Sequence, residues 1–297
     1  MGSLKYLIII LNILTSCGLL ISSIKRSDFS TMFSSSKSTD TIKEPKFAPS
    51  VVKSFINFPP VSNVLLSISK SAMINSAEKG GIPWTLMMNT LKRKEKILKS
   101  YFAEIEDKSI EYPEYYIQNF HGYKGGNLNW MAAHECESAA KFVAAGTYAG
   151  EKLDVDVAFD KMRTSFTDSI KSYVSKYRSN TFNSIADIGC SIGMTTFYLG
   201  KAFPNLEKLD AYDLSPYFLA VAKYRQNVIL NEDFVEMTER QSVWSHLSNI
   251  PASSVSMIRW LHAKAENMKD TPSDSYDLTV ISAVLHELPQ VNSKIGG

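Results

Sequence analysis

One short segment, residues 184–196, limits the fold of this chain more than any other part of the sequence. It begins Ser-Ile-Ala-Asp-Ile, the pattern of a buried strand that carries one carboxylate, Asp187. Two glycines, Gly189 and Gly193, bound the turn that follows, and Met-Thr-Thr then opens a helix. Glycine lacks the Cβ atom that would hold a ligand away from the backbone, and a helix start offers free N–H groups. The segment is typical of an α/β protein that binds a nucleotide-like ligand.

A second acidic position supports this interpretation. Residues 208–212 predict another short strand, and Asp213 follows it about twenty residues after Gly193. A carboxylate placed there can accept both hydroxyl groups of a ribose. The full dinucleotide motif G-x-G-x-x-G is absent, because Ser191 stands where its second glycine would be. The pattern therefore favours a nucleoside site over a dinucleotide site.

The same turn also fits a serine hydrolase. Its residues Gly-Cys-Ser-Ile-Gly match the nucleophile elbow G-x-S-x-G, with Ser191 as the nucleophile. Asp277 and His286 bracket one predicted strand, so if that strand is continuous, at about 3.3 Å per residue its ends lie roughly 30 Å apart and the two side chains cannot meet. Asp213 with His262 or His286 stays open as the rest of a triad.

Four motifs recur at the spacing of one enzyme family. They are residues 187–193 (Asp-Ile-Gly-Cys-Ser-Ile-Gly), 212–215 (Tyr-Asp-Leu-Ser), 263–268 (Ala-Lys-Ala-Glu-Asn-Met) and 276–281 (Tyr-Asp-Leu-Thr-Val-Ile). Together they resemble class I S-adenosylmethionine-dependent methyltransferases, over roughly residues 80–289. Other segments resemble the plant and algal branch that is grouped with ubiquinone/menaquinone-biosynthesis methyltransferases. They are the ending 284–289 (Val-Leu-His-Glu-Leu-Pro) and the upstream segments 112–116, 120–123 and 126–130.

The resemblance implies a set of residues around S-adenosyl-L-methionine. Asp187 and the glycine turn would hold the methionine part, Asp213 the ribose, and Ala265 and Glu266 the border of the adenine. The implied cofactor-binding residues are Asp187, Gly189, Ser191, Gly193, Asp213, Leu214, Ala265, Glu266 and Ser282. The family often has an aspartate where Lys264 stands, and a lysine cannot accept the adenine amino proton.

The implied chemistry is methyl transfer to a small acceptor, aromatic or prenylated and thus lipid-like. His286 and Glu287 follow the last predicted strand and face the expected cleft. A base there would take the proton of a phenol or quinol acceptor. No metal is expected. The alternatives are the serine hydrolase, a non-catalytic methyltransferase-like binding protein and an inactive fragment.

Strand and helix patterns alternate along the second half of the chain. Strands are predicted at 184–188, 208–212, 255–261 and 276–285, and helices at 157–177, 194–203 and 216–226, after a helical region that includes 84–101 and 130–145. Alternation predicts a Rossmann-like parallel sheet with helices on both faces. The resembled fold has seven strands and this sequence supplies about four, so we expect a C-terminally truncated chain with a bare hydrophobic sheet edge.

The first 45 residues have a different character. Residues 7–14 form an apolar run of signal-peptide length, and residues 6–24 are just long enough to anchor in a bilayer. A Ser/Thr-rich tract follows, as in transit peptides. We therefore expect the secretory pathway or a plastid, with a membrane anchor as the alternative. The predicted regions are a targeting segment (1–45), a helical cap (46–150) and the cofactor domain (151–297).

Composition excludes several other classes. The chain has 297 residues, of which 44% are hydrophobic, and its 32 basic and 30 acidic residues give a net charge of +2. Such a balance does not predict a nucleic-acid partner. The three cysteines, Cys17, Cys136 and Cys190, are too few and too scattered for a disulfide framework or a zinc site.

Overall fold

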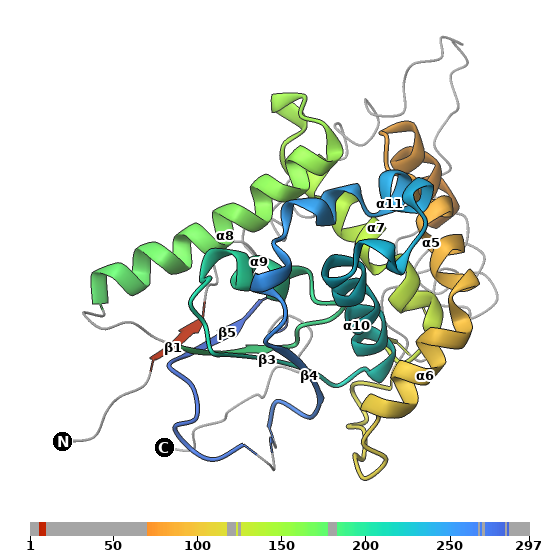
Figure 1. Cartoon of the computed structure of the whole chain (residues 1–297). Helices are drawn as coiled ribbons and strands as arrows, with labels where there is room; N and C mark the ends of the chain where they lie inside the picture. Colours follow the sequence, from red (N-terminus) through yellow and green to blue (C-terminus); the bar gives the residue numbers. More distant parts are fainter. Residues whose placement is uncertain are drawn as a thin grey trace, which may run out of the picture. The chain divides into compact units, whose positions relative to one another are not determined.

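The computed structural model describes residues 6–9, 70–117, 123, 126–177, 183–266, 268, 271–282 and 284. The chain divides into two compact units. One comprises residues 11–79, of which the described residues 70–79 are helical. The other comprises residues 1–10 and 80–297 and contains every labelled element in Figure 1.

The second unit is built on an open parallel sheet. Its strands lie in the order β1-β5-β2-β3-β4, and every neighbouring pair is parallel. The strands are β1 (Tyr6–Ile9), β2 (Ser184–Ile188), β3 (Lys208–Asp213), β4 (Ile258–His262) and β5 (Leu278–Ile281). The predicted α/β class with a parallel sheet is confirmed, and four of the strands lie where the sequence predicts them.

Two details of the sheet differ from the prediction. Strand β1 comes from the apolar N-terminal segment and pairs with β5, so that edge of β5 is covered. The prediction of a strand over 276–285 is too long, because β5 ends at Ile281, and Ser282 and Val284 lie outside it. The rest of the predicted targeting segment lies outside the described residues. Among the residues described, no helix is both long and apolar enough to cross a bilayer.

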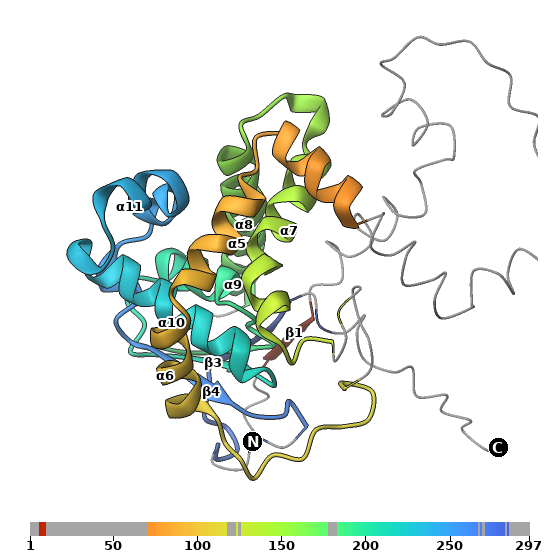
Figure 2. The ribbon, with the colours of Figure 1, turned by 90° about the vertical axis from the view of Figure 1, so that its right-hand side faces the viewer.

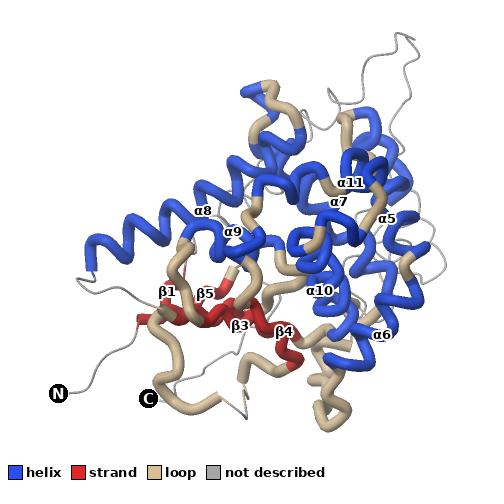
Figure 3. The backbone as a smooth tube through the Cα atoms, viewed as in Figure 1, coloured by secondary structure: helices blue, strands red, loops and turns tan. Residues whose placement is uncertain are grey.

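Three helices cover one face of the sheet. They are α8 (Val155–Tyr177), α9 (Met194–Ala202) and α10 (Pro216–Leu230), as Figures 1 and 3 show. The predicted helices on both faces are not found in the described part of the chain, because its residues between β4 and β5 form turns and loop. That connection is polar, contains Pro272 and lacks a helical apolar repeat. Helix α8 buries Ala158, Phe166 and Ile170, which lie on one face of the helix because they are spaced by multiples of four residues.

The region before α8 supplies three more helices. They are α5 (Trp84–Arg93), α6 (Glu95–Ile105) and α7 (Trp130–Thr147). The single helix predicted over 84–101 is interrupted at Lys94, whose backbone (φ −90°, ψ 13°) leaves the helical range. Helix α7 begins as predicted at Asn129, whose side chain accepts the Ala132 N–H at 2.9 Å. Helix α5 packs on α7 and α6 packs on α10 (Figure 2).

Shorter elements complete the unit. They are α11 (Met237–Val243) and four 3₁₀ turns, η1 (Ala149–Glu151), η2 (Glu232–Phe234), η3 (Ser245–Asn249) and η4 (Ala252–Ser254).

The strand order of the sheet indicates where a ligand would bind. From β2 the chain moves outward through β3 to β4 and then returns to β5 on the other side of β2. Ligands of such sheets bind at this reversal, beyond the carboxyl ends of the strands.

Candidate functional site

The glycine turn lies at the carboxyl end of β2 and bends as predicted. The N–H groups of Gly189 and Cys190 both donate to the Tyr212 carbonyl of β3, at 2.7 and 2.9 Å. Gly189, Ser191 and Gly193 all have positive φ values, of 72°, 53° and 78°. Such values suit glycine but are uncommon for serine. The turn is thus held tightly against the end of β3.

The two glycines make room for side chains of the chain itself. A Cβ atom on Gly189 would lie 2.1 Å from Val284 Cγ2, and one on Gly193 would lie 2.6 Å from the Trp260 ring. The space that sequence analysis assigned to a ligand is therefore filled at these two points. The N–H groups of Gly189, Cys190, Ser191 and Gly193 already donate within the chain, so the groups that remain for a ligand are the neighbouring carboxylates.

Asp187 is one of these carboxylates. It stands near the end of β2, is 1% exposed, and accepts the Thr196 hydroxyl of α9 at 2.7 Å. Burial raises the pKa of Asp187 to about 6, and the charge of Asp213 adds to the rise. The protein therefore holds this charge at neutral pH at a cost in stability.

Asp213 is the second carboxylate, and it lies beside the turn. Its oxygens accept the Ser191 N–H at 2.7 Å and the Ser215 N–H at 2.8 Å, and the Tyr116 side chain also hydrogen-bonds it. Burial nevertheless raises the pKa of Asp213 to about 6. The predicted juxtaposition of the turn and the carboxylate is present. Perturbed carboxylates of this kind concentrate at functional sites.

Tyrosines from the segment after α6 cover the same edge of the sheet. The Tyr115 hydroxyl donates to Glu266 at 2.7 Å, and the Tyr112 hydroxyl lies 3.3 Å from His262 Nε2. Tyr115 thus binds Glu266 and Tyr116 binds Asp213, and both partners are predicted cofactor residues. Sequence analysis missed these contacts, although the motif at 112–116 contains all three tyrosines.

His262, at the end of β4, joins this segment to the sheet. Its Nδ1 accepts the Asp107 N–H at 2.9 Å, so in the neutral ring Nε2 carries the proton and donates to the Leu214 carbonyl at 3.1 Å. Burial lowers the pKa of His262, which favours this neutral form. Both ring nitrogens are thus engaged in positioning the backbone around the predicted ribose carboxylate.

Buried charged side chains of α7 and α10 also hold the turn in place. Arg225 of α10 donates to the Ile192 carbonyl at 2.8 Å and lies 3.2 Å from the Glu137 carboxylate of α7. His246 pairs with the same carboxylate. Burial raises the pKa of Glu137, but Arg225 and His246 outweigh it and lower the pKa below its ordinary value. This cluster fixes the turn relative to α7 and α10.

The remaining predicted residues are less well placed. Ala265 and Glu266 are exposed, and Ser282 is half-buried just after β5. His286 and Glu287, the predicted catalytic residues, lie outside the described residues, so their role stays a prediction. In the described parts of the chain, no group of three or more His, Cys, Asp or Glu side chains is arranged to hold a metal ion.

The serine-hydrolase residues can be placed in part. The Ser191 hydroxyl lies 3.3 Å from Cys136 Sγ of α7. Asp277 lies at the opposite edge of the sheet, where its carboxylate accepts the Ser184 hydroxyl at 2.8 Å at the start of β2. Asp277 therefore cannot serve Ser191. The predicted separation of Asp277 and His286 stays untested, because His286 lies outside the described residues, and the continuous strand on which it rested is not found.

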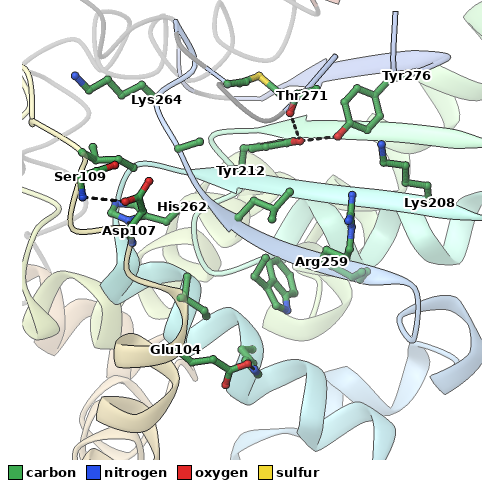
Figure 4. Close-up of a pocket in the computed structure, with 18 of the residues that line it drawn as sticks. Glu104, Asp107, Ser109, Lys208, Tyr212, Arg259, His262, Lys264, Thr271 and Tyr276 are labelled. Atoms are coloured by element: carbon green, nitrogen blue, oxygen red, sulfur yellow. Dashed lines mark hydrogen bonds and ion pairs between the residues drawn. The ribbon is translucent and has the colours of Figure 1, made fainter. Parts of the chain in front are cut away.

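A groove of about 970 Å³ runs along β4, the edge strand (Figure 4). Its walls include the end of α6, β4 itself and the segment between β4 and β5, but Asp187, Ser191 and Asp213 are not among the described residues that line it. The groove and the glycine turn are therefore separate features. We locate the candidate site by the hydrogen bonds and charges of the turn, not by the size of this groove.

Two residues that line the groove, Arg259 and Tyr276, hold another buried carboxylate, Asp210 of β3. Arg259 binds both of its oxygens, at 2.6 and 2.5 Å, and the Tyr276 hydroxyl donates to it at 2.5 Å. Burial raises the pKa of Asp210, but the hydrogen bonds from Arg259 and Tyr276 outweigh burial and lower it below its ordinary value. This carboxylate is fully compensated.

Comparisons of the chain with protein-family models, with curated proteins and with solved structures found no match. What is established is an α/β unit with an open parallel sheet and an acidic glycine turn at its topological reversal.

Proposed function

We propose that this chain is an S-adenosylmethionine-dependent methyltransferase. The observation that carries the proposal is the contact between the Ser191 N–H and the Asp213 carboxylate, with Asp187 buried at the adjacent end of β2. This arrangement offers two carboxylates to a ligand that has ribose hydroxyls and an ammonium group. The four sequence motifs and the parallel sheet support the same class.

In this proposal each residue has a defined task. The Asp213 carboxylate accepts the two ribose hydroxyls after the Tyr116 side chain has moved away from it. The Asp187 carboxylate faces the ammonium group of the ligand, which offsets the cost of burying its own charge. His262 orients the backbone of Leu214 at the rim of the site.

Methyl transfer from a sulfonium places few chemical demands on the chain. The leaving thioether departs readily, so orientation of the donor and acceptor and exclusion of water dominate catalysis. The proposed acceptor is a small aromatic or prenylated molecule. His286 and Glu287 remain the proposed residues at the acceptor.

Calorimetry with S-adenosylhomocysteine tests the proposal. The wild-type chain should bind it with a micromolar dissociation constant, and Asp213→Ala should weaken binding at least about 100-fold, because buried hydrogen bonds to a charged group are lost. Ser191→Ala is the matched control, since it keeps the backbone N–H and should bind within about threefold of wild type. Absence of binding to folded wild type would contradict the proposal.

A serine hydrolase is the second candidate, and the positive φ of Ser191 favours it, since nucleophile elbows are strained in this way. Among the described residues, however, the hydroxyl of Ser191 is hydrogen-bonded to Cys136, and no histidine bonds it. Ester hydrolysis that is lost in Ser191→Ala, without binding of S-adenosylhomocysteine, would support this candidate instead.

A further inference from the structure

The groove along β4 carries more positive charge than the carboxylate beneath it can neutralise. Lys208 of β3 and Arg259 of β4 both line the groove, and their nitrogens lie 3.4 and 2.5 Å from the same oxygen, Oδ2 of Asp210. One carboxylate thus faces two cations. Because both cations are held near a single oxygen, they also lie close to each other, and their mutual repulsion is only partly offset.

The hydrogen bonds of Asp210 are complete without Lys208. Arg259 binds both of its oxygens, and the Tyr276 hydroxyl donates to Oδ2 at 2.5 Å. Since Tyr276 has only one proton to donate, it accepts from the Tyr212 hydroxyl at 2.5 Å. Tyr212 then accepts from the Thr271 hydroxyl at 2.8 Å. This chain of hydroxyls, drawn in Figure 4, therefore directs its protons toward the carboxylate.

Lys208 and Arg259 consequently keep donors for another acceptor. A guanidinium has five N–H donors and an ammonium three, so most of these donors remain after Asp210 is bound. The side chains are 34% and 59% exposed, so a ligand in the groove can reach both. Figure 4 shows them next to each other on one wall of the groove.

The acidic side chains among the described residues of the groove come from another part of the chain. Glu104 belongs to α6, and Asp107 and Glu111 belong to the segment that follows α6. In Figure 4, Glu104 and Asp107 stand apart from Lys208 and Arg259. A negatively charged ligand group is therefore favoured beside Lys208 and Arg259, away from these acids.

The groove also offers apolar surface. Half-buried apolar side chains line it, namely Ile105, Ile110, Leu261 and Met268. Its volume of about 970 Å³ lies in the range of sites that bind small organic molecules. A ligand that uses both the apolar surface and the excess positive charge has one negative charge and an apolar body.

We propose that this groove is a second ligand site, which binds an organic monocarboxylate with an apolar body. Lys208 and Arg259 hold the carboxylate, whose single negative charge balances the positive charge that Asp210 leaves over. The apolar side chains cover the body of the ligand. Asp187 and Asp213 do not line the groove, so this inference stands independently of the proposed function.

Calorimetry with 2-naphthoate tests the inference, with the uncharged 2-naphthalenemethanol as the matched ligand. Wild type should bind 2-naphthoate with a dissociation constant below about 1 mM, as expected for a ligand of this size that is well covered. The alcohol should bind at least about tenfold more weakly, because it forms no charge-assisted hydrogen bonds. Lys208→Met should bind 2-naphthoate about five- to tenfold more weakly than wild type and the alcohol within about twofold of wild type.

Lys201→Met is the control variant. Lys201 lies on α9, has a similarly exposed side chain (36%) and does not line the groove, so both affinities should stay within about twofold of wild type. If a thermal melt shows that Lys208→Met does not fold, Lys208→Gln replaces it with the same expected result.

Three outcomes would overturn the inference. They are failure of wild type to bind 2-naphthoate, equal affinities of wild type for the acid and the alcohol, and binding of the acid that the Lys208 variant leaves unchanged. Saturating S-adenosylhomocysteine should not displace 2-naphthoate, and displacement would place the acid outside the groove. A wild type that binds 2-naphthoate but not S-adenosylhomocysteine would support this inference and contradict the proposed function alone.

Discussion

Asp210 and Asp213 lie three residues apart on one strand, and both are buried, but their surroundings differ completely. Asp210 is bound by Arg259 and Tyr276, and its pKa is lowered. Asp213 is bound by backbone N–H groups and a tyrosine, and its pKa is raised to about 6. The compensated carboxylate holds strands together. Asp213 has hydrogen bonds but forms no ion pair with any described residue, as we expect of the proposed ribose carboxylate.

The largest expected effect comes from removing the Asp210 carboxylate, which Arg259 and Tyr276 bind. Asp210→Ala should lower the free energy of unfolding by about 2–3 kcal/mol, because the buried Tyr276 hydroxyl loses its acceptor. Arg259 contributes little to this value, since it is 59% exposed and is hydrated once released. Urea unfolding measures the change. Asp168→Ala, an exposed carboxylate on α8, is the control and should change stability by less than about 0.5 kcal/mol.

Removing the charge of Asp187 should have the opposite effect and raise the free energy of unfolding. Asp187→Asn keeps an oxygen for the Thr196 hydroxyl but removes a charge whose folded-state pKa is raised to about 6. Because its pKa is raised on folding, the Asp187 carboxyl stabilises the folded state below about pH 4, and this stabilisation is lost as the pH rises through about 6. Asp187→Asn should therefore be about 1–3 kcal/mol more stable than wild type at pH 7.5. Equal urea stabilities at pH 7.5 would contradict the raised pKa.

The affinity for S-adenosylhomocysteine should also depend on pH, through the protonation of Asp213. Protonated Asp213 cannot accept two ribose hydroxyls, so S-adenosylhomocysteine should bind about tenfold more weakly at pH 5 than at pH 7. The decline should set in near pH 6, the value to which burial raises the pKa of Asp213. Asp213→Asn should bind more weakly and should lose the Asp213 part of this pH dependence, while the part due to Asp187, whose pKa burial also raises to about 6, remains. A flat profile in wild type would show that Asp213 does not bind the ligand.

The smallest expected effect concerns the tyrosine that competes with the ribose. Tyr116→Phe removes the hydroxyl that bonds Asp213 in the ligand-free protein. S-adenosylhomocysteine should then bind about two- to fivefold more tightly, since the hydrogen bond from Tyr116 to the Asp213 carboxylate no longer has to be exchanged for one from the ligand. Tyr148→Phe, at the end of α7, is the control and should leave affinity unchanged. Weaker binding by Tyr116→Phe would instead place the hydroxyl in contact with the ligand.

The sequence predicted the parts of this site that are local. Residues 184–196 form the strand, turn and helix in the predicted order, and Asp213 reaches the turn because β3 pairs beside β2. A buried strand and positive-φ glycines leave clear signals in a single segment.

Contacts between distant segments left no such signal. Arg259 meets Asp210 through the register of β4 on β3, and Arg163 of α8 donates to the Thr195 hydroxyl at the start of α9. Neither residue belongs to a motif. The end of β5 was also missed, because the apolar run in the sequence continues beyond Ile281 although the strand does not.

Proton linkage is the most direct test of the claim that the two carboxylates beside the turn bind the ammonium and ribose hydroxyl groups of the ligand. Wild type is titrated with S-adenosylhomocysteine at pH 6 in two buffers that differ in ionisation enthalpy. Asp187 and Asp213 are each about half protonated there, and the ligand should lower both pKa values. We predict the release of about 0.5–1 proton for each ligand bound. Binding without proton release, or proton uptake, would contradict the account.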